Sequence, residues 1–353
     1  MAEQQKALFL PEKQGAFALG DKPIPFPGPG ELLLKVEAVG LNPLDWKLQK
    51  WGVPAFIHEY PAVLGEDIAG TVESVGEGVS GFAKGDRVIY QGTFTPDKAG
   101  FQQYTLAVAQ FTAKIPSNIS LDEGATLPTA VATAAMGLYA PINDTAPGGA
   151  GLTAPWEAGG RGKYAGKPIL VLGGSSSVGQ MVIQFAKLSG FSPIITTASQ
   201  TNQTLVNSLG ATHLIDRALP AESFHAAVSS ITTAPLEIIY NTISTPETQQ
   251  VAYDLLAPGG AVVFTLPLAI KVGAQGKKRV INVFGAVAIP SQQKTGAGLY
   301  AALEGLLANG ELKPNPVRVL PGGLNGVVDG LREMEEGRVS GYKLIVHPQE
   351  TGA

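Results

Sequence analysis

The stretch VLGGSSSVGQMVIQFAKLSG, residues 171–190, decides the fold of this chain. It begins at the end of an apolar run and passes through two adjacent glycines and three consecutive serines. Apolar residues then recur at helical spacing, namely Val178, Met181, Val182, Phe185 and Ala186. A strand, a glycine-rich turn and a helix in this order are typical of a phosphate-binding turn in a nucleotide-binding sheet.

The residue types of this turn explain how it could hold a pyrophosphate. Gly173 and Gly174 permit a tight turn with an exposed backbone, and Gly179 lets the helix pack close to the sheet. The helix N-terminus adds free N–H groups and a partial positive charge. We therefore expect a dinucleotide to be bound by Gly173, Gly174, Ser175, Ser176, Ser177, Val178 and Gly179. The spacing is not a strict G-x-G-x-x-G, so a glycine turn needed only for packing is the alternative.

After Lys167, strand-like and helix-like segments alternate. The expected strands are PILVLGG, SPIITTAS, THLIDR, LEIIYNTIS, GAVVFTL and RVINVFGAV. The expected helices include the run from Ser177, NQTLVNSLG and PETQQVAYDLLAPGG. This alternation predicts an α/β domain with a doubly wound parallel sheet, a Rossmann arrangement.

The end of the second expected strand indicates which dinucleotide is bound. An NAD site usually carries an acidic residue there for the ribose 2′-hydroxyl, but TTASQTN places Ser199 at this point. A hydroxyl, Asn202 and the cation Arg217 could accept a 2′-phosphate that a carboxylate would repel. The sequence therefore favours NADPH. The alternative is that Arg217 is an ordinary surface charge.

The region from Lys6 to about Pro116 has a different texture. Short apolar runs such as ELLLKVEAVG, IAGTVESVG, GDRVIY and GFQQYTLAV are bounded by Gly, Pro or Asp. They predict a small antiparallel β-barrel or sandwich. The Gly/Pro/Ala-rich segment from Asn143 to Lys167 is interpreted as a surface excursion and not as a domain boundary.

Composition limits the classes of function. The 353 residues suit two domains, and a net charge of −4 without a Lys/Arg cluster argues against a nucleic-acid or anionic-membrane partner. The chain has no cysteine, which excludes disulfides, cysteine-ligated zinc and thiol nucleophiles. The first residues lack the apolar run of a signal peptide, and the longest apolar stretches are strand-sized. We expect a cytoplasmic protein with no membrane partner.

Several motifs together resemble the medium-chain dehydrogenase/reductase superfamily over nearly the whole chain. They are GLNPLDWK, LGEDIAGTVESVGEGVSGFAKGDRV, LPTAVATAAMGLY, the glycine turn, LGA at 209–211 and LAPGGAVV, in the family's order. The resemblance implies a GroES-like catalytic domain over residues 1–127 and a Rossmann NADPH-binding domain over residues 128–293. Residues 294–353 would complete the catalytic domain.

The resemblance also bears on metal chemistry. Zinc alcohol dehydrogenases of this superfamily carry Cys, His and Cys at positions that match Asn42, Glu66 and Thr129 here. Zinc prefers thiolate and imidazole ligands, and the four histidines of this chain show no ligand spacing. We expect no metal. The chain is most similar to the zinc-free branch, that is, to quinone oxidoreductases and to trans-acting enoyl reductases of fungal polyketide pathways.

The family's positions suggest which residues carry the chemistry. Asn42, in the loop that faces the nicotinamide, is a plausible donor to a substrate carbonyl. Lys47 would reach the cofactor's ribose or phosphates, or else is a solvated lysine beside a tryptophan. Thr133 would lie near the carboxamide, and Phe284 and Gly285 would flank the nicotinamide.

Other polar residues near these motifs have less specific interpretations. Asp45 is expected to order its own turn. Glu66 lines the pocket or is a buried structural carboxylate, and on a strand Glu66 and Asp67 would point to opposite faces. A proton could come from one of the tyrosines, Tyr60, Tyr90 and Tyr139, or from water.

Three functions follow from these observations. The first is an NADPH-dependent reductase of an activated C=C bond in an enone, enal or enoyl chain, with polyketide or other secondary metabolism as the setting. The second is an NADPH quinone reductase. The third is a cofactor-binding partner protein with little turnover. A homodimer and a megasynthase partner both stay open.

Overall fold

A computed structural model of the chain describes residues 3–52, 56–273 and 277–352. It divides into two compact units, each described here by itself. Unit 1 comprises Met1–Thr129, Leu303–Gly310 and Pro314–Ala353. Unit 2 comprises Ala130–Ala302 and Glu311–Lys313.

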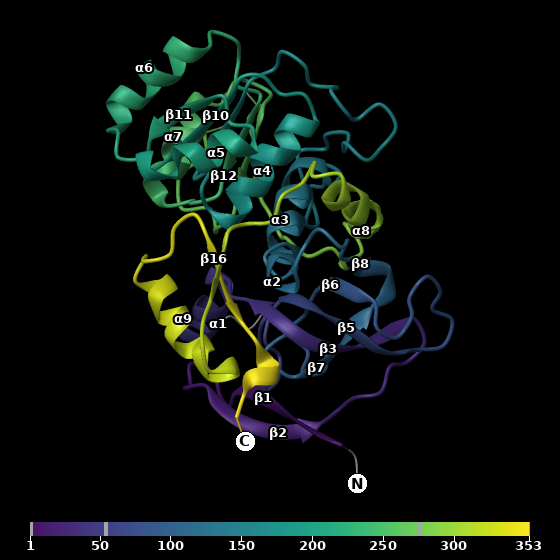
Figure 1. The fold of residues 1–353 in the computed structure, drawn as a ribbon. Helices are drawn as coiled ribbons and strands as arrows, with labels where there is room; N and C mark the ends of the chain where they lie inside the picture. The colour runs from purple at the N-terminus through teal and green to yellow at the C-terminus, as the bar shows by residue number, and fades with distance from the viewer. Residues whose placement is uncertain (1–2, 53–55, 274–276, 353) are drawn as a thin grey trace. The chain divides into compact units, whose positions relative to one another are not determined.

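Unit 2 is built on a six-stranded parallel sheet in the order β11-β10-β9-β12-β13-β14 (Figure 1). In chain order, its strands are β9 (Ile169–Leu172), β10 (Ile194–Ala198), β11 (His213–Asp216), β12 (Ile238–Asn241), β13 (Ala261–Phe264) and β14 (Arg279–Asn282). Strand order reverses between β9 and β12, as in dinucleotide-binding sheets, whose ligands lie at the carboxyl ends of the strands. The expected Rossmann sheet is confirmed, strand by strand.

Helices cover both faces of this sheet. They are α4 (Ser177–Leu188), α5 (Gln203–Leu209), α6 (Ala221–Ile231) and α7 (Pro246–Leu255). Phe224 of α6 and Ala252 of α7 share one core with Leu170 and Leu172 of β9. Since side chains alternate along a strand, the intervening Val171 points to the other face, where α4 contacts β9 and β10.

The excursion from Asn143 to Lys167 has little regular structure, as expected, but two aromatic residues anchor it. The Trp156 ring lies 5.2 Å from the Tyr139 ring and 5.7 Å from that of Phe185 on α4, centroid to centroid. Tyr164 stacks on Phe191 at 5.0 Å. Tyr139 belongs to α3 (Pro128–Tyr139), so the excursion is held against the helices of unit 2.

Unit 1 is mainly β-structure. A seven-stranded sheet has the order β15-β16-β3-β5-β6-β8 with β7 paired to β3, and a smaller sheet has the order β2-β1-β4. The strands are β1 (Gln4–Leu10), β2 (Ala18–Pro23), β3 (Glu31–Gly40), β4 (Ala62–Val63), β5 (Asp67–Val75), β6 (Arg87–Gln91), β7 (Tyr104–Val108), β8 (Thr112–Lys114), β15 (Val317–Val319) and β16 (Lys343–Val346). β16 pairs antiparallel with β3, Ile345 opposite Gly40, so the end of the chain completes this sheet.

Helices α1 (Pro43–Trp51) and α9 (Gly326–Glu335) pack together in unit 1 (Figure 1). Leu48 of α1 and Leu331 of α9 are both buried in its core. The sequence did not predict α1, and Asn42, which was expected in a loop, is the N-cap of this helix. Pro43 occupies the first turn of a helix, where its missing N–H costs nothing, and the Asp45 carboxyl accepts the Asn42 backbone N–H at 2.8 Å.

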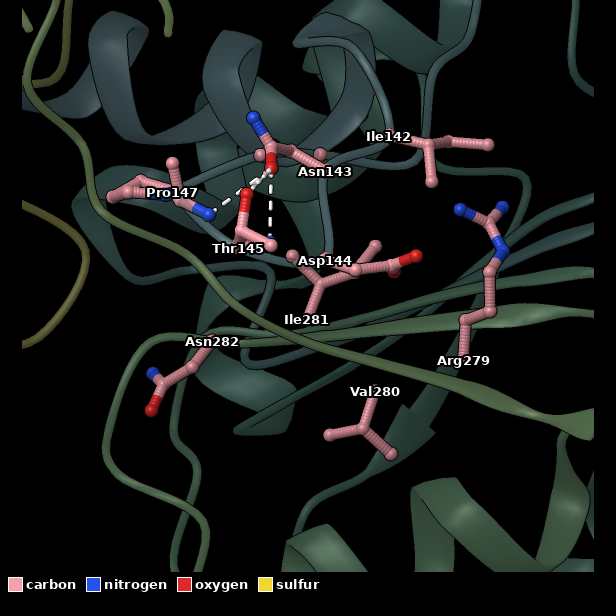
Figure 2. Close-up of a pocket in the computed structure, with 12 residues that line it drawn as sticks. Ile142, Asn143, Asp144, Thr145, Pro147, Arg279, Val280, Ile281 and Asn282 are labelled. Carbon is pink, nitrogen blue, oxygen red and sulfur yellow. Dashed lines mark hydrogen bonds between the residues drawn. The ribbon is translucent and has the colours of Figure 1, made fainter.

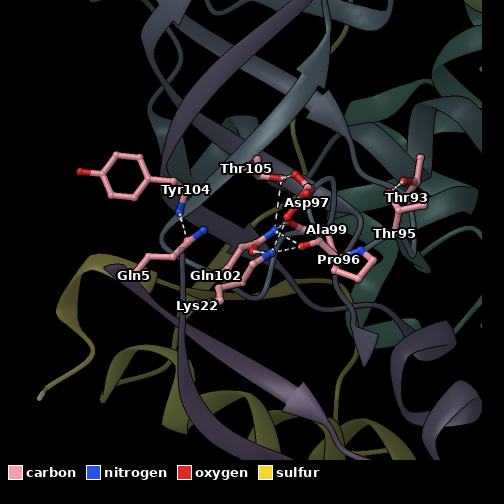
Figure 3. Close-up of polar contacts among 10 residues, drawn as sticks. All are labelled: Gln5, Lys22, Thr93, Thr95, Pro96, Asp97, Ala99, Gln102, Tyr104 and Thr105. Carbon is pink, nitrogen blue, oxygen red and sulfur yellow. Dashed lines mark hydrogen bonds and ion pairs between the residues drawn. The ribbon is translucent and has the colours of Figure 1, made fainter. Parts of the chain in front are cut away.

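A polar network ties the loop before β7 to β2 (Figure 3). The Lys22 ammonium donates to the Pro96 carbonyl at 2.6 Å, to Asp97 at 2.8 Å and to Gln102 at 3.0 Å. The Gln102 amide donates in turn to the Ala99 carbonyl at 2.8 Å. Gln102 is fully buried, so these bonds satisfy polar groups that water cannot reach.

The helix α8 (Gln293–Ala308) is the longest helix of the structure and runs from unit 2 into unit 1. Across the described residues, none of the helices combines the length and the apolar character that crossing a bilayer would require.

The end of the chain is fastened to unit 1 by a histidine between two carboxylates. His347 Nε2 lies 2.8 Å from Asp122 on α2 (Leu121–Gly124), and its Nδ1 lies 3.0 Å from Glu350. Burial lowers the pKa of His347, but the two carboxylates outweigh this effect and raise the pKa above its ordinary value. The imidazolium form therefore stabilises the fold.

We expect His347→Gln to destabilise the protein at acid pH only. Because the folded pKa is raised, the stabilisation is complete below the ordinary histidine pKa and is lost as pH rises through the folded value. Since the pair is partly solvated, the difference in unfolding free energy should be at most about 1 kcal/mol near pH ~5.5 and vanish by pH ~9. Urea titrations across this range measure it, and a difference that grows with pH would contradict the assignment.

Candidate active site

The glycine turn joins β9 to α4 at the carboxyl end of the sheet. Gly173 adopts a left-handed conformation with φ +85°. A Cβ on Gly179 would lie 2.2 Å from the Gly173 carbonyl oxygen, and one on Gly174 would lie 2.0 Å from Thr196 Oγ1. Glycine is therefore required at all three positions, for conformation in the first and for space in the others. The close packing of helix on sheet predicted from Gly179 is confirmed.

The serines of the turn have different roles: one caps α4, and another lines a cavity. Ser176 is the N-cap of α4, and its hydroxyl accepts the Gly179 N–H at 3.0 Å. The same hydroxyl lies 2.8 Å from Thr242 Oγ1, so it is occupied by the fold. Ser177 and Val178 form the first turn of α4, where backbone N–H groups lack helical partners and favour an anion.

Ser175 lines a cavity of about 320 Å³ in unit 2, together with Gly173 and Arg217. Its other walls are Leu172, Thr197, Ala198, Leu219, Ala221, Phe224, Ile243, Glu247, Thr248 and Val251. Mostly apolar walls with a few polar groups are the general form of a small-molecule or cofactor site. The residues present therefore fit an adenine dinucleotide.

The three residues expected at a 2′-phosphate lie around the ends of β10 and β11. Arg217 follows β11, is exposed and donates its backbone N–H to the Ala198 carbonyl at 3.0 Å. Ser199 follows β10, and its hydroxyl lies 2.8 Å from that of Thr201. Asn202 ends the short helix that begins after Ser199. Arg217 lines the cavity, whereas Ser199 and Asn202 are not among the residues described as lining it.

Thr133 meets the loop that follows β14. A Cβ on Gly285 would lie 2.2 Å from Thr133 Oγ1 and 3.0 Å from its Cα, so this loop passes directly against α3. The Tyr240 hydroxyl donates to the Thr133 carbonyl at 2.7 Å. The structure thus brings together Thr133, Gly285 and the adjacent Phe284 within unit 2.

A larger cavity of about 560 Å³ lies along the edge strand β14 (Figure 2). Residues 142–149 form its other wall, and the Asn143 side chain accepts bonds from the Thr145 and Ala146 N–H groups at 3.0 Å. These hydrogen bonds within residues 143–146 fix the shape of that wall of the cavity. The cavity lacks the glycine turn and the helix N-terminus, and we assign no cofactor to it.

In unit 1, Asn42 belongs to a buried polar cluster. Its side-chain amide donates to Asp67 Oδ2 at 2.9 Å and accepts from Lys343 Nζ at 2.9 Å. Lys343 and Asp67 also form an ion pair, with side chains 3% and 0% exposed. Asp67 Oδ1 accepts the backbone N–H of Thr129, in the first turn of α3. Asn42 is the N-cap of α1, and its N–H donates to Asp45 at 2.8 Å, which confirms the local role expected for Asp45.

This cluster favours the neutral forms of two carboxyl groups. Burial raises the pKa of Asp45 to about 7 despite the hydrogen bond from Asn42. Burial, together with the negative charges of Asp45 and Asp67, raises the pKa of Glu66 well above its ordinary value. Glu66 directly precedes β5, and its carbonyl accepts the Gly92 N–H at 2.7 Å, so the pairing with β6 extends to it.

A catalytic zinc does not fit this cluster. The matching residues are an amide, a carboxyl group and a threonine, and the chain has no cysteine. The Lys343 ammonium bonds directly to Asn42 and Asp67, placing a positive charge where a metal ligand set would need electron donors. Within the described ranges, no three His, Cys, Asp or Glu side chains form a group that could hold a metal ion.

Lys47 and two of the three candidate tyrosines are packed within the fold. The Lys47 ammonium lies 5.5 Å from the Trp46 ring centroid and 5.7 Å from that of Trp51, and burial lowers its pKa. The contact with Trp46 agrees with the alternative of a lysine beside a tryptophan, but Lys47 is half-buried and not solvated as that alternative had it. Tyr139 and Tyr90 are core residues whose pKa values burial raises, which disfavours both as mobile proton donors.

Sequence reasoning missed Asp67 and Lys343 as members of the site. One signal was present: Lys343 stands in YKLIV, where a charge in an apolar run requires a buried partner. Its partner could not be named, because Lys343 and Asp67 are 276 residues apart.

We expect the unfolding free energy of Glu66→Gln, measured relative to that of the wild type, to increase as pH rises. The folded pKa of Glu66 is raised, so its contribution is complete below the ordinary glutamate pKa and is lost above it, whereas glutamine does not ionise. The relative gain in unfolding free energy between pH ~5 and ~9 should reach about 1 kcal/mol or more. Asp45→Asn should change in the same direction, and a relative loss with rising pH in both variants would contradict the electrostatics.

Comparison with known families agrees with this architecture. The alcohol dehydrogenase GroES-like domain matches residues 28–117, and the zinc-binding dehydrogenase family matches residues 177–282. A mycobacterial quinone oxidoreductase has the same fold, with a TM-score of 0.73 at 22% identity over 98% of this chain and 100% of its own. A mycobacterial structure complexed with NADPH has a TM-score of 0.75 at 21% identity, also covering 98% and 100%.

A trans-enoyl reductase of Aspergillus japonicus, himH, is 34% identical over 323 residues, which cover 90% of this chain and 89% of that protein. Another, tndF of Aspergillus flavipes, is 30% identical and covers 98% and 99%. The resemblance to the medium-chain superfamily is confirmed. The chain belongs to the trans-enoyl reductase family of the medium-chain dehydrogenases/reductases and is a nicotinamide-dependent oxidoreductase.

Proposed function

We propose that this protein uses NADPH to reduce an α,β-unsaturated acyl chain, enone or enal in secondary metabolism. The observation that carries the proposal is the cavity at the glycine turn, where Arg217 stands at the rim and Ser199 replaces an acidic residue. Family membership supplies the reaction type. In this proposal, residues 1–127 and 294–353 form the catalytic domain, and residues 128–293 bind the cofactor.

The described groups offer a place for each part of the cofactor. The turn from Gly173 to Gly179 would place the pyrophosphate at the N-terminus of α4. The N–H groups of Gly173, Gly174 and Gly179 themselves donate within the fold. Arg217, Ser199 and Asn202 would hold the 2′-phosphate by charge-assisted hydrogen bonds. Thr133, with Phe284 and Gly285, would line the nicotinamide. When bound, NADPH supplies a hydride to an electrophilic carbon.

The substrate must be polarised by the protein's own groups. Asn42 would donate an amide hydrogen to the carbonyl oxygen conjugated with the C=C bond, drawing electron density from the β-carbon. The hydride adds at that carbon, and a proton from solvent adds at the α-carbon, so one C=C bond becomes a C–C bond. Lys47 would contribute a positive charge near the cofactor's ribose or phosphates.

A quinone is the second candidate substrate. The shared fold with a mycobacterial quinone oxidoreductase favours it, and a quinone accepts a hydride without the carbonyl positioning that an enoyl chain needs. The enoyl chain could be free or held by a megasynthase. A homodimer is also proposed, since β14 is an edge strand of its sheet.

The proposed function is tested by following NADPH oxidation with two matched panels, short enoyl thioesters and quinones. We expect turnover of enoyl thioesters and recovery of the saturated products. Turnover of quinones alone would support the second candidate. Tight NADPH binding with no turnover in either panel would leave a binding protein and contradict the proposal.

We expect Arg217→Ala to weaken NADPH binding by about tenfold to a hundredfold, because one charged hydrogen bond to the 2′-phosphate is lost. NADH binding, which involves no such phosphate, should not change. Ser199→Asp should add repulsion and reverse the preference. Fluorescence titration with both cofactors measures these effects, and an equal loss for NADPH and NADH would show that Arg217 does not contact the phosphate.

A further inference from the structure

The amide of Asn42 is held from both sides by charged groups. Lys343 donates to its oxygen at 2.9 Å, and its nitrogen donates to Asp67 at 2.9 Å. All three side chains are buried, at 5% exposed or less. Among the described residues, Asp67 is the one acceptor of the Nδ2 group, which carries two hydrogens.

The two charges determine which way the amide points. Rotating it by half a turn would place its NH₂ group against the Lys343 ammonium and its oxygen against the Asp67 carboxylate. Both contacts would then be repulsive in a site with little water to screen them. The observed orientation is therefore strongly preferred, and the second Nδ2 hydrogen has a determined direction.

The charges also change the amide as a donor. A cation at the oxygen withdraws electron density from the nitrogen, so the remaining N–H becomes a stronger hydrogen-bond donor. Asp67 makes a second connection, since its other oxygen accepts the Thr129 N–H at the beginning of α3. One carboxylate thus links Asn42, the N-cap of α1, to the first turn of α3.

Stability alone is a weak reason for this arrangement. Burying an ammonium and a carboxylate costs much of what their attraction returns, and an apolar pair of similar volume is often as stable. Such groups are better explained by the geometry they impose on a neighbour.

We propose that Lys343 and Asp67 are positioning residues that orient and polarise the Asn42 amide, so that its second N–H is the donor to the substrate carbonyl. This rests on the proposed function, for which Asn42 is the carbonyl donor. The role belongs to the chain's own ion pair and involves no metal.

A double-mutant cycle on the enoyl reduction tests the proposal. Asn42→Ala should lower kcat by about a hundredfold, as for loss of one oxyanion donor. Lys343→Met should lower kcat by about tenfold, and Asn42→Ala/Lys343→Met should fall no further than Asn42→Ala alone. Fully additive losses would show that Lys343 does not act through Asn42 and would overturn the proposal.

Two further variants separate positioning from folding. Lys343→Met leaves Asp67 buried without its cation, so Lys343→Met/Asp67→Asn, which removes both charges, provides a second version if the single variant fails to fold. The kcat of this double variant should fall at least as far as the kcat of Lys343→Met. A double variant with the kcat of the wild type would overturn the proposal. Lys22→Met, which breaks the ion pair with Asp97 in the same unit, is the matched control and should keep kcat unchanged.

A measurement without turnover distinguishes failure of this inference from failure of the proposed function. In protein labelled with ¹⁵N-asparagine, the Asn42 side-chain signals are those lost in Asn42→Ala. Removing the cation should shift them in Lys343→Met/Asp67→Asn, while Lys22→Met leaves them in place. Unmoved signals would overturn the inference even if enoyl substrates are reduced. Shifted signals without enoyl reduction would support the orientation of the Asn42 amide by Lys343 and Asp67 but would refute the proposed function.

Discussion

The ion pair between Lys343 and Asp67 is the interaction on which the chemistry of unit 1 depends. Two opposite charges buried in a protein core must pair with good geometry, because otherwise the desolvation of each charge destabilises the fold. Here they join the start of β16 to the start of β5, and they do so at Asn42. The last strand of the chain is thereby required for the site as well as for the sheet. A mutation in residues 343–346 would therefore affect both.

Unit 2 depends on a different constraint, the close approach of backbone to backbone. The carbonyl of Gly173 leaves no room for a side chain at position 179. Thr133 likewise leaves no room for a side chain at position 285. Space rather than charge determines these positions, so each admits glycine alone. In the proposed function, the two units would serve different halves of the reduction: the glycine turn and the N-terminus of α4 would hold a dinucleotide, and a polarised amide would bind a carbonyl.

Much of the fold could be predicted from the sequence because its signals are local. All six strands of the parallel sheet follow apolar runs bounded by turn residues, and the turn at 173–179 is contiguous. The site of unit 1 is not local, since Asn42 and Lys343 are 301 residues apart. Helix α1 was not predicted from the sequence, where Asp45 alone was interpreted as ordering its own turn.

In the proposed reaction, a hydride from the cofactor reaches the β-carbon of an enoyl chain through groups supplied by this chain alone. We would use chelator-treated protein, an enoyl thioester and NADPH in which both hydrogens at C4 of the nicotinamide are deuterium, so that either face transfers a label. We expect deuterium at the β-carbon of the saturated product, at the rate of untreated protein. Deuterium absent from that carbon, or activity lost on chelation and restored by zinc, would contradict the account.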